Sequence, residues 1–225
     1  MSKQWKRELT VVWLVGWLAA AGCGKGGNDS SAPPAALNGS AAASAGSSAT
    51  PAAAEDPLHP IVVFDTTAGP IKVRLDAERA RLTVDNFLGY VKSGHYDGTI
   101  FHQVFQGQGV IGGGYTAALE EKPPRPPVRN EADNGLKNRR GTIAMLRSID
   151  AIDSAQAQFF FNLADNPSLD HRDRTTEGYG YCVFGEVIEG LDVLDRIGAM
   201  PVKDTEQFDH MPVETVIIRS VRALK

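Results

Sequence analysis

Three consecutive phenylalanines, Phe159 to Phe161, directly follow the side-chain amide of Gln158. This run lacks helical spacing, and together with the apolar run from Thr142 to Met145 it predicts two neighbouring strands. Successive side chains of a strand point to opposite faces, so Phe159 and Phe161 are expected to face one way and Phe160 the other. One phenylalanine can then form the floor of a surface pocket while its neighbours fill the core, and Gln158 beside that floor can orient a ligand.

Other patterns with chemical potential lack the context that their chemistry requires. Residues 107 to 112 fit the glycine fingerprint of dinucleotide-binding folds, but no helix pattern follows, so these glycines are expected to allow tight turns and close strand approach. Cys182 lies in an apolar strand pattern and is expected to be a buried, unreactive side chain. The histidines show no metal-ligand spacing, and neither a metal nor a cofactor is expected; they are His59, His95, His102, His171 and His210.

The beginning of the chain has the features of an export signal. Basic residues precede an uncharged run from Leu9 to Ala21, which is shorter than the about 20 apolar residues of a membrane-spanning helix. Residues 20 to 23, Ala-Ala-Gly-Cys, resemble a bacterial lipobox with alanine in place of the usual leucine. The resemblance implies that residues 1 to 22 form a signal peptide and that Cys23 carries lipid. An ordinary secretory signal followed by an incidental cysteine is the alternative.

Composition divides the rest of the chain into a tether and one domain. Residues 24 to 57 contain eleven Ala, six Ser, five Gly and four Pro, which cannot build a core. As a flexible chain they would span roughly 30 to 35 Å. Residues 58 to 225 are expected to form a single domain. The net charge of -4, without a concentrated basic region, argues against nucleic acid as a partner.

Eight runs in this domain have the length and composition of strands. They are 59–66, 71–75, 99–105, 110–113, 141–145, 158–163, 181–188 and 215–222. Thr83 is expected to be the N-cap of a helix that ends before Gly94, and Leu191 to Ile197 predicts a second helix. Eight strands are enough to close a barrel that its own side chains fill. The expected fold class is mostly β: a closed eight-stranded antiparallel β-barrel capped by two α-helices.

Five motifs along the domain resemble those of the cyclophilin-type peptidyl-prolyl cis-trans isomerases, particularly the bacterial envelope ones. They are FHQVF near 101, NEADNG near 130, GTIAM near 141, QFFFN near 158 and CVFGEV near 182. The resemblance covers roughly residues 60 to 224 and implies an enzyme that rotates X-Pro peptide bonds, against a barrier of about 18 to 20 kcal/mol. Such a catalyst needs an apolar socket for the proline ring and a hydrogen-bond donor to the prolyl nitrogen, whose lone pair becomes available as the amide twists.

In cyclophilins this donor is an arginine directly after the Phe-His pair, and the matching position here is Gln103. A glutamine amide still donates a hydrogen bond, but it is neutral and shorter than arginine. Replacing a charge-assisted bond by an ordinary one costs about 1 to 2 kcal/mol. The resemblance therefore implies that Gln103 is the catalytic residue and that turnover is reduced, on the order of tenfold to thirtyfold if the amide reaches the prolyl nitrogen and about a thousandfold if it does not.

The residues that the resemblance assigns to the substrate pocket fall into two groups. One group matches the family: His102, Met145, Gln158, Phe160, Leu169 and Tyr181. The other departs from it: Gln108 and Gly109 replace a Phe-Met pair, Ile111 a glutamine, Leu146 an alanine and Ser168 an aromatic residue. These departures predict a wider and more polar pocket. Judged without the resemblance, Phe160 and Met145 would be interpreted as core residues.

Two functions follow from the resemblance. The first is an isomerase of reduced activity in the cell envelope, lipid-anchored on the extracytoplasmic side, in the periplasm or at the cell surface. Its partners would be X-Pro segments of exported proteins, whose folding it would assist. The alternative is a weak or inactive member of the same fold that binds extended peptides as a chaperone. A monomer is expected in both cases, and a purely structural envelope lipoprotein is a third, less favoured interpretation.

Overall fold

The computed structural model describes residues 56 to 224. The barrel strands are β1 (Ile61–Thr66), β2 (Gly69–Leu75), β3 (Thr99–Phe105), β4 (Gly109–Thr116), β5 (Thr142–Met145), β6 (Phe159–Asn162), β7 (Val183–Glu189) and β10 (Ile217–Ala223). The helices are α2 (Arg81–Lys92) and α3 (Leu191–Gly198), with short 3-10 helices η1 (Ala132–Asn134) and η2 (Pro167–Leu169). A separate hairpin joins β8 (Val202–Lys203) to β9 (Met211–Pro212). The sequence did not predict this β8–β9 hairpin, because two-residue strands are too short to show alternation.

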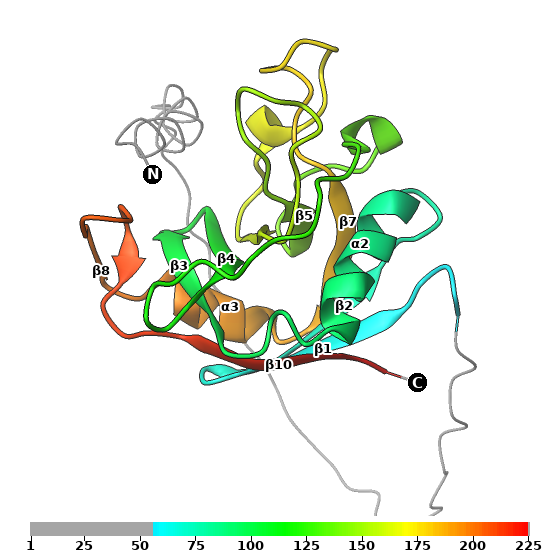
Figure 1. Cartoon of the computed structure of the whole chain (residues 1–225). Coiled ribbons are helices and arrows are strands. Elements are labelled where there is room, and N and C mark those ends of the chain that lie inside the picture. The colour runs from blue at the N-terminus through cyan, green and yellow to red at the C-terminus, as the bar shows by residue number, and fades with distance from the viewer. Residues whose placement is uncertain (1–55, 225) are drawn as a thin grey trace, which may run out of the picture. The chain divides into compact units, whose positions relative to one another are not determined.

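The eight strands close the barrel in the order β1-β10-β3-β4-β6-β5-β7-β2, and β2 pairs back to β1 (Figure 1). Every neighbouring pair is antiparallel. The predicted closed eight-stranded antiparallel barrel is therefore confirmed. Within residues 56 to 224, neither α-helix combines the length and the apolar character that crossing a membrane requires. The predicted signal peptide, Cys23 and all but the last two residues of the predicted tether lie outside the described residues.

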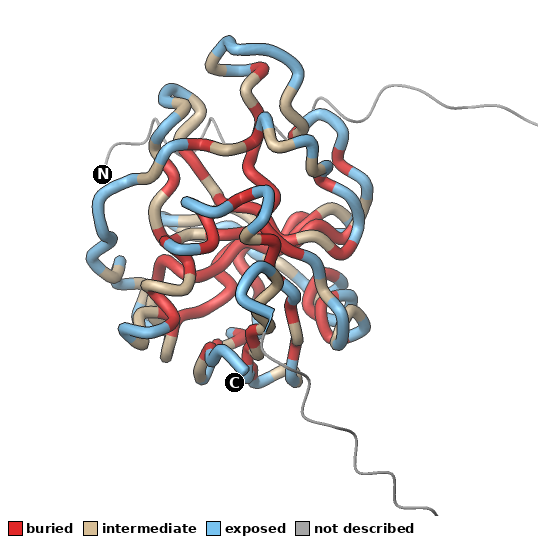
Figure 2. Tube along the Cα trace, turned by 90° about the vertical axis from the view of Figure 1, so that its right-hand side faces the viewer, coloured by how far each residue is buried: buried red, intermediate tan, exposed pale blue. Residues whose placement is uncertain are grey.

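Aromatic side chains fill the interior of the barrel. The rings of Phe159 and Phe161 on β6 each lie 5.5 Å, between centroids, from the ring of Phe64 on β1. Phe87 of α2 and Leu194 of α3 belong to the same interior cluster, so both helices bury an apolar face against it. Figure 2 shows the buried segments running through the centre and the exposed ones around it. Phe160 belongs to a different cluster, which confirms the alternation predicted for β6.

Helix α2 begins at Arg81, two residues before the predicted N-cap. Ala80 occupies the N-cap position and provides no side-chain hydrogen bond. Instead, the carboxylate of Glu131 accepts hydrogen bonds from the backbone N–H groups of Leu82 and Thr83, at 3.1 and 2.8 Å. The prediction of Thr83 as the N-cap is therefore wrong. A carboxylate from a distant loop satisfies the free N–H groups, and its charge suits the positive end of the helix dipole.

The glycines of β4 allow close packing inside a strand, as predicted. A Cβ atom at Gly112 would lie 2.8 Å from the ring of Phe101, and one at Gly113 would lie 2.6 Å from the ring of Phe159. Gly113 also has a positive φ of 88°, which side chains rarely adopt. The strand continues to Thr116 with no helix after it, so these residues lack the architecture of a dinucleotide site.

Cys182 is buried in the interior cluster next to the first turn of α2. Its Sγ lies 3.4 Å from the hydroxyl oxygen of Thr83. Burial raises the pKa of the Cys182 thiol to about 12, so the thiolate is not populated near neutral pH. The predicted burial of Cys182 is confirmed, and its raised pKa agrees with the predicted lack of reactivity.

Candidate active site

A second apolar cluster, which we call the outer cluster, lies on the outward faces of β3, β4, β5 and β6. Phe160 is at its centre, because it pairs with Ile111 of β4 on one side and with Ala144 of β5 on the other. The buried members are Phe105, Ile111, Ala144, Phe160, Leu169, Tyr181 and Val183, and Leu136 and Leu146 pack against them. The cluster therefore unites five predicted pocket residues: Ile111, Leu146, Phe160, Leu169 and Tyr181.

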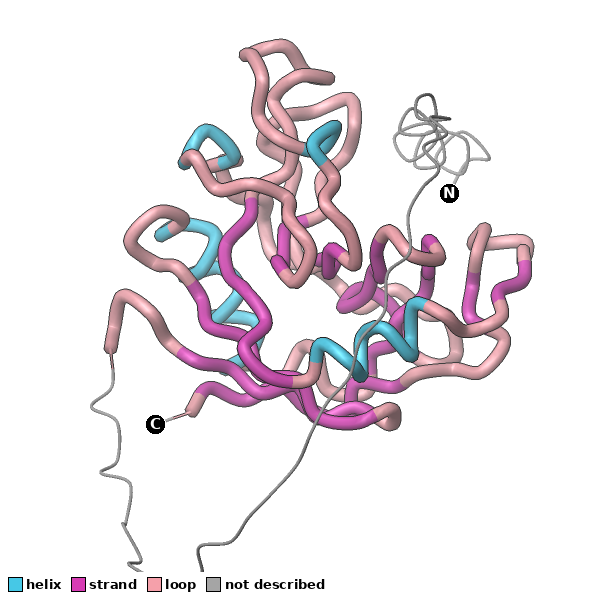
Figure 3. Tube along the Cα trace, turned by 180° about the vertical axis from the view of Figure 1, so that it is seen from behind, coloured by secondary structure: helices cyan, strands magenta, loops and turns pink. Residues whose placement is uncertain are grey.

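The long loops complete this face of the molecule. The loops that join β5 to β6 and β6 to β7 lie on one side of the barrel, as Figure 3 shows. The second loop carries Leu169 and Tyr181, and the backbone N–H of Tyr181 donates to the carbonyl of Leu169 at 2.9 Å. The Tyr181 ring packs edge-on against Phe160, with 5.7 Å between centroids. A cluster of aromatic and aliphatic side chains bordered by tyrosine is the kind of lining that suits a proline ring.

Met145 does not belong to the outer cluster, although the resemblance assigns it to the pocket. Its side chain is buried in the interior cluster with Phe159 and Phe161. Alternation along β5 explains the difference, because Ala144 points outward and both neighbours of Ala144 point inward. Ala144 was not among the predicted pocket residues, although the period of two along β5 places it on the same face as Phe160.

His102 is a neutral packing residue in this structure. The residue is 1% exposed, and the centre of its ring lies 4.9 Å from the centres of the rings of both Tyr115 and Phe208. Burial lowers the pKa of His102 to about 3, against the opposing effects of the Ile100 backbone and the Gln158 side chain. The imidazole is therefore uncharged at neutral pH and does not replace the cation that the family uses.

Gln158 packs closely against β4 near His102. A Cβ atom at Gly114 would lie 2.6 Å from Cγ and 2.9 Å from Nε2 of Gln158, so only glycine leaves room for this amide. The backbone carbonyl of Gln158 accepts the N–H of Leu146 at 2.9 Å, which ties it to the loop after β5. Gln158 is partly exposed. Its position is thus fixed by the backbone and by β4, while part of the residue stays accessible.

Gln103 is fixed by the β8–β9 hairpin. The residue is 6% exposed, and Nε2 donates a hydrogen bond to the backbone carbonyl of Asp209 at 3.2 Å. The neighbouring N–H of Val104 donates to the carbonyl of His210 at 2.9 Å, so the hairpin lies along β3. Gln103 pairs with Ile111 across β3 and β4, which places it at the border of the outer cluster. An amide nitrogen carries two hydrogens, so the bond to Asp209 leaves one for a substrate.

Gln108 and Ser168 occupy the positions where the family has bulky side chains. Gln108 lies in the turn before β4, where its carbonyl accepts the N–H of Leu163 at 2.8 Å and the amide of Asn166 at 3.1 Å. Its backbone is thus held in place, and the residue is partly exposed. Ser168 is exposed in η2, directly before the buried Leu169. The polar departures therefore lie at the accessible margin, while the apolar floor is retained.

Arg147, two residues after the end of β5, is a site residue that the sequence did not predict. It is 5% exposed and donates hydrogen bonds to the carbonyls of Gly180 at 2.8 Å, Ser148 at 2.8 Å and Thr176 at 2.6 Å. Its guanidinium carbon lies 5.1 Å from the centre of the Tyr181 ring. Arg147 therefore connects both loops behind Tyr181. Nothing in the sequence signals this role, because an arginine beside a polar loop is normally interpreted as exposed.

Burial and the interaction between Arg147 and Tyr181 shift the pKa of each residue in opposite directions. Burial lowers the pKa of Arg147, and Tyr181 opposes that shift. Burial raises the pKa of Tyr181, and the cation of Arg147 opposes that shift. Arginine keeps its proton in proteins, so the wall behind Tyr181 carries a buried positive charge.

The barrel, its two helices and the outer cluster define the class of the protein. Residues 61 to 223 match the family described as cyclophilin type peptidyl-prolyl cis-trans isomerase/CLD. The chain therefore belongs to the cyclophilin-type peptidyl-prolyl cis-trans isomerases, and it is an enzyme of that class.

Individual relatives agree with this assignment. The chain is 44% identical over 164 residues to peptidyl-prolyl cis-trans isomerase A of Dickeya dadantii (strain 3937), covering 73% of this chain and 84% of that protein. It is also 44% identical over 161 residues to peptidyl-prolyl cis-trans isomerase B of Escherichia coli (strain K12), covering 72% of this chain and 98% of that protein. Among solved structures, the fold resembles the crystal structure of a cyclophilin type peptidyl-prolyl cis-trans isomerase of Cryptosporidium parvum, with a TM-score of 0.61 and 24% sequence identity. The match covers 74% of this chain and 98% of that chain, and it supports the fold.

Proposed function

We propose that this isomerase acts with reduced efficiency on X-Pro segments of exported proteins, and that Gln103 supplies the catalytic hydrogen bond. One observation carries the proposal. The Gln103 amide is held at the border of the outer cluster by the Asp209 carbonyl, with one N–H left to donate. A held donor does not have to reorganise when the transition state forms, and this is the condition for electrostatic stabilisation.

The proposed mechanism needs no covalent step. The proline ring packs on Phe160, with Ile111, Leu169 and Tyr181 around it. As the peptide bond twists, the prolyl nitrogen regains its lone pair and accepts a hydrogen bond from Nε2 of Gln103. Because this bond is absent in the planar substrate, it lowers the barrier and not only the binding free energy. The crystal structure of a distant cyclophilin type isomerase in the presence of the dipeptide Ala-Pro supports a proline-containing ligand.

The test compares the wild type with Gln103→Arg in the isomerisation of a short X-Pro peptide. We expect slow catalysis by the wild type and a gain in kcat/KM on the order of tenfold in the variant, because the donor becomes charged. Gln106→Arg is the matched control, since Gln106 is exposed and its amide bonds to the distant carbonyl of Met200. If the wild type is inactive and Gln103→Arg is active, the result would favour the alternative of a peptide-binding protein. Inactivity of both forms would refute the proposed site.

The proposed location is the cell envelope, with a lipid on Cys23 and residues 24 to 57 as the tether. Support comes from the uncharged run from Leu9 to Ala21 and from the lipobox-like sequence that follows it. A single acyl chain binds a membrane only marginally, so the proposal requires more than one chain on this cysteine. Mass spectrometry of the mature N-terminus tests it. An acylated Cys23 as the first residue is expected, and an unmodified N-terminus at another residue would contradict the proposal.

A further inference from the structure

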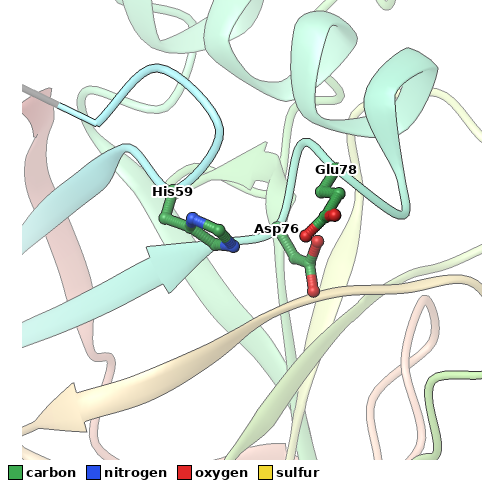
Figure 4. Close-up of side chains that lie close together, drawn as sticks. All are labelled: His59, Asp76 and Glu78. Atoms are coloured by element: carbon green, nitrogen blue, oxygen red, sulfur yellow. The ribbon is translucent and has the colours of Figure 1, made fainter.

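A histidine and two carboxylates lie together where the domain begins, and none of them belongs to the outer cluster. His59, Asp76 and Glu78 each offer one ligand atom, and these atoms lie within 4.8 Å of one another. Figure 4 shows a nitrogen of the imidazole and the two carboxylates turned toward one another. Asp76 is buried, His59 is partly buried and Glu78 is exposed, so the group opens to solvent on one side.

Backbone hydrogen bonds hold the two segments that carry these side chains. The N–H of Leu75 donates to the carbonyl of Pro60 at 2.9 Å, and the N–H of Ala77 donates to the carbonyl of Leu58 at 2.8 Å. His59 is therefore fixed opposite the connection between β2 and α2. Ligands on a rigid scaffold lose little freedom when they bind an ion.

The tautomer of His59 is set by a carboxylate outside the group. Nδ1 lies 2.8 Å from Oδ2 of Asp56, and Asp56 is itself held by the N–H of Leu58, which donates to Oδ1 at 2.9 Å. Metal-binding histidines commonly donate their second ring nitrogen to such a carboxylate. With Nδ1 donating, a neutral imidazole presents the lone pair of Nε2 to an ion.

The charge of the group favours a cation. The group and its neighbour Asp56 contain three carboxylates, those of Asp56, Asp76 and Glu78. One guanidinium contacts them: Nε and Nη2 of Arg79 each lie 2.8 Å from Oδ2 of Asp76. Two negative charges remain uncompensated when His59 is neutral. Arg79 neutralises part of Asp76 and competes with an ion for it, so its removal should strengthen cation binding.

We propose that His59, Asp76 and Glu78 bind a divalent transition-metal ion of the zinc type, with Asp56 orienting His59. One imidazole nitrogen and two carboxylate oxygens match the donors of Zn²⁺, and the open side leaves room for water. The imidazole disfavours Ca²⁺, which takes six to eight oxygen ligands. A bound ion would cross-link the segment that enters the domain to the start of α2. The site is independent of the proposed catalytic mechanism.

Cobalt is the probe, because Co²⁺ takes zinc sites and its visible absorption reports coordination by protein ligands. The full-length protein, in a Cys23→Ser background that removes the N-terminal thiol, is titrated with Co²⁺ and then with Zn²⁺ in competition. We expect absorption bands of four- or five-coordinate cobalt, which Zn²⁺ abolishes. His59→Gln and Glu78→Gln should each weaken binding by tenfold or more, and Asp56→Asn by about tenfold.

Two further sets of variants make the test specific. Arg79→Gln should tighten binding, because it removes the competing cation and keeps a hydrogen-bond donor. His171→Gln and Asp85→Asn are the matched controls outside the site and should leave affinity unchanged. The absence of such cobalt bands, equal effects of control and site variants, or weaker binding by Arg79→Gln would each overturn the proposal. Isomerase activity in the presence of a chelator should be unchanged, which separates this proposal from the catalytic one.

Discussion

Replacing Arg147 with methionine tests whether this buried cation organises the wall of the active site. The substitution keeps a long side chain but removes the hydrogen bonds to the carbonyls of Gly180, Ser148 and Thr176. Hydrogen bonds made by a charged group contribute about 1.5 to 3 kcal/mol each, while removing the buried charge returns a large part of the loss. We therefore expect the free energy of unfolding to fall by about 2 to 4 kcal/mol.

The stability assay is thermal or chemical unfolding followed by circular dichroism. For a domain of this size the expected loss corresponds to a Tm lower by roughly 4 to 16 °C. At a temperature where Arg147→Met is folded, kcat/KM should also fall, because Tyr181 loses the cation behind its ring. Arg172→Met, at an exposed position in the loop before Tyr181, is the control. A variant as stable and as active as the wild type would refute the role assigned to Arg147.

Three further predictions follow from the described contacts. Phe160→Ala opens a cavity at the centre of the outer cluster and should destabilise the protein by about 3 to 5 kcal/mol. Under conditions where the variant is folded, its KM should be raised, and an unchanged KM would place the proline ring elsewhere. Burial lowers the pKa of His102 from its ordinary 6.5 to about 3 in the folded protein, so between these values only the unfolded chain binds the proton. The free energy of unfolding therefore falls as the pH drops from about 6.5 toward 3, by up to about 1.4 kcal/mol per pH unit. His102→Phe should show a smaller loss of unfolding free energy between pH 7 and 5, and an equal loss would contradict the burial argument. Glu131→Gln should lower the unfolding free energy by about 1 kcal/mol, because the first turn of α2 loses an ionised acceptor; urea unfolding measures this, and an unchanged midpoint would argue against the cap.

The sequence predicted those features that depend on local periodicity. The alternation of Phe159, Phe160 and Phe161 fixed which ring fills the interior, and eight strand-like runs were enough to expect a closed barrel. The same rule, had it been applied to β5, would have kept Met145 inside and brought Ala144 to the outer cluster. Resemblance to a family assigned Met145 to the pocket without regard to this period.

Contacts between distant segments could not be predicted in this way. Gln103 depends on a carbonyl 106 residues further along the chain, and the start of α2 on a carboxylate 48 residues beyond Thr83. Arg147 is buried because two loops fold over it, and no pattern of residues in the sequence predicts this burial. His59 likewise meets Asp76 and Glu78 only because backbone bonds join their segments. Such partners are set by the closure of the barrel and not by spacing in the sequence.

The central claim is that the Gln103 amide donates a hydrogen bond in the transition state of X-Pro rotation. The most direct test is exchange NMR of an Ala-Pro peptide with the wild type, Gln103→Leu and Gln106→Leu. Leucine removes the donor at similar size, so Gln103→Leu should slow exchange by about twofold to tenfold, while Gln106→Leu leaves it unchanged. Exchange by Gln103→Leu at the rate of the wild type would contradict the claim and place the donor on another residue.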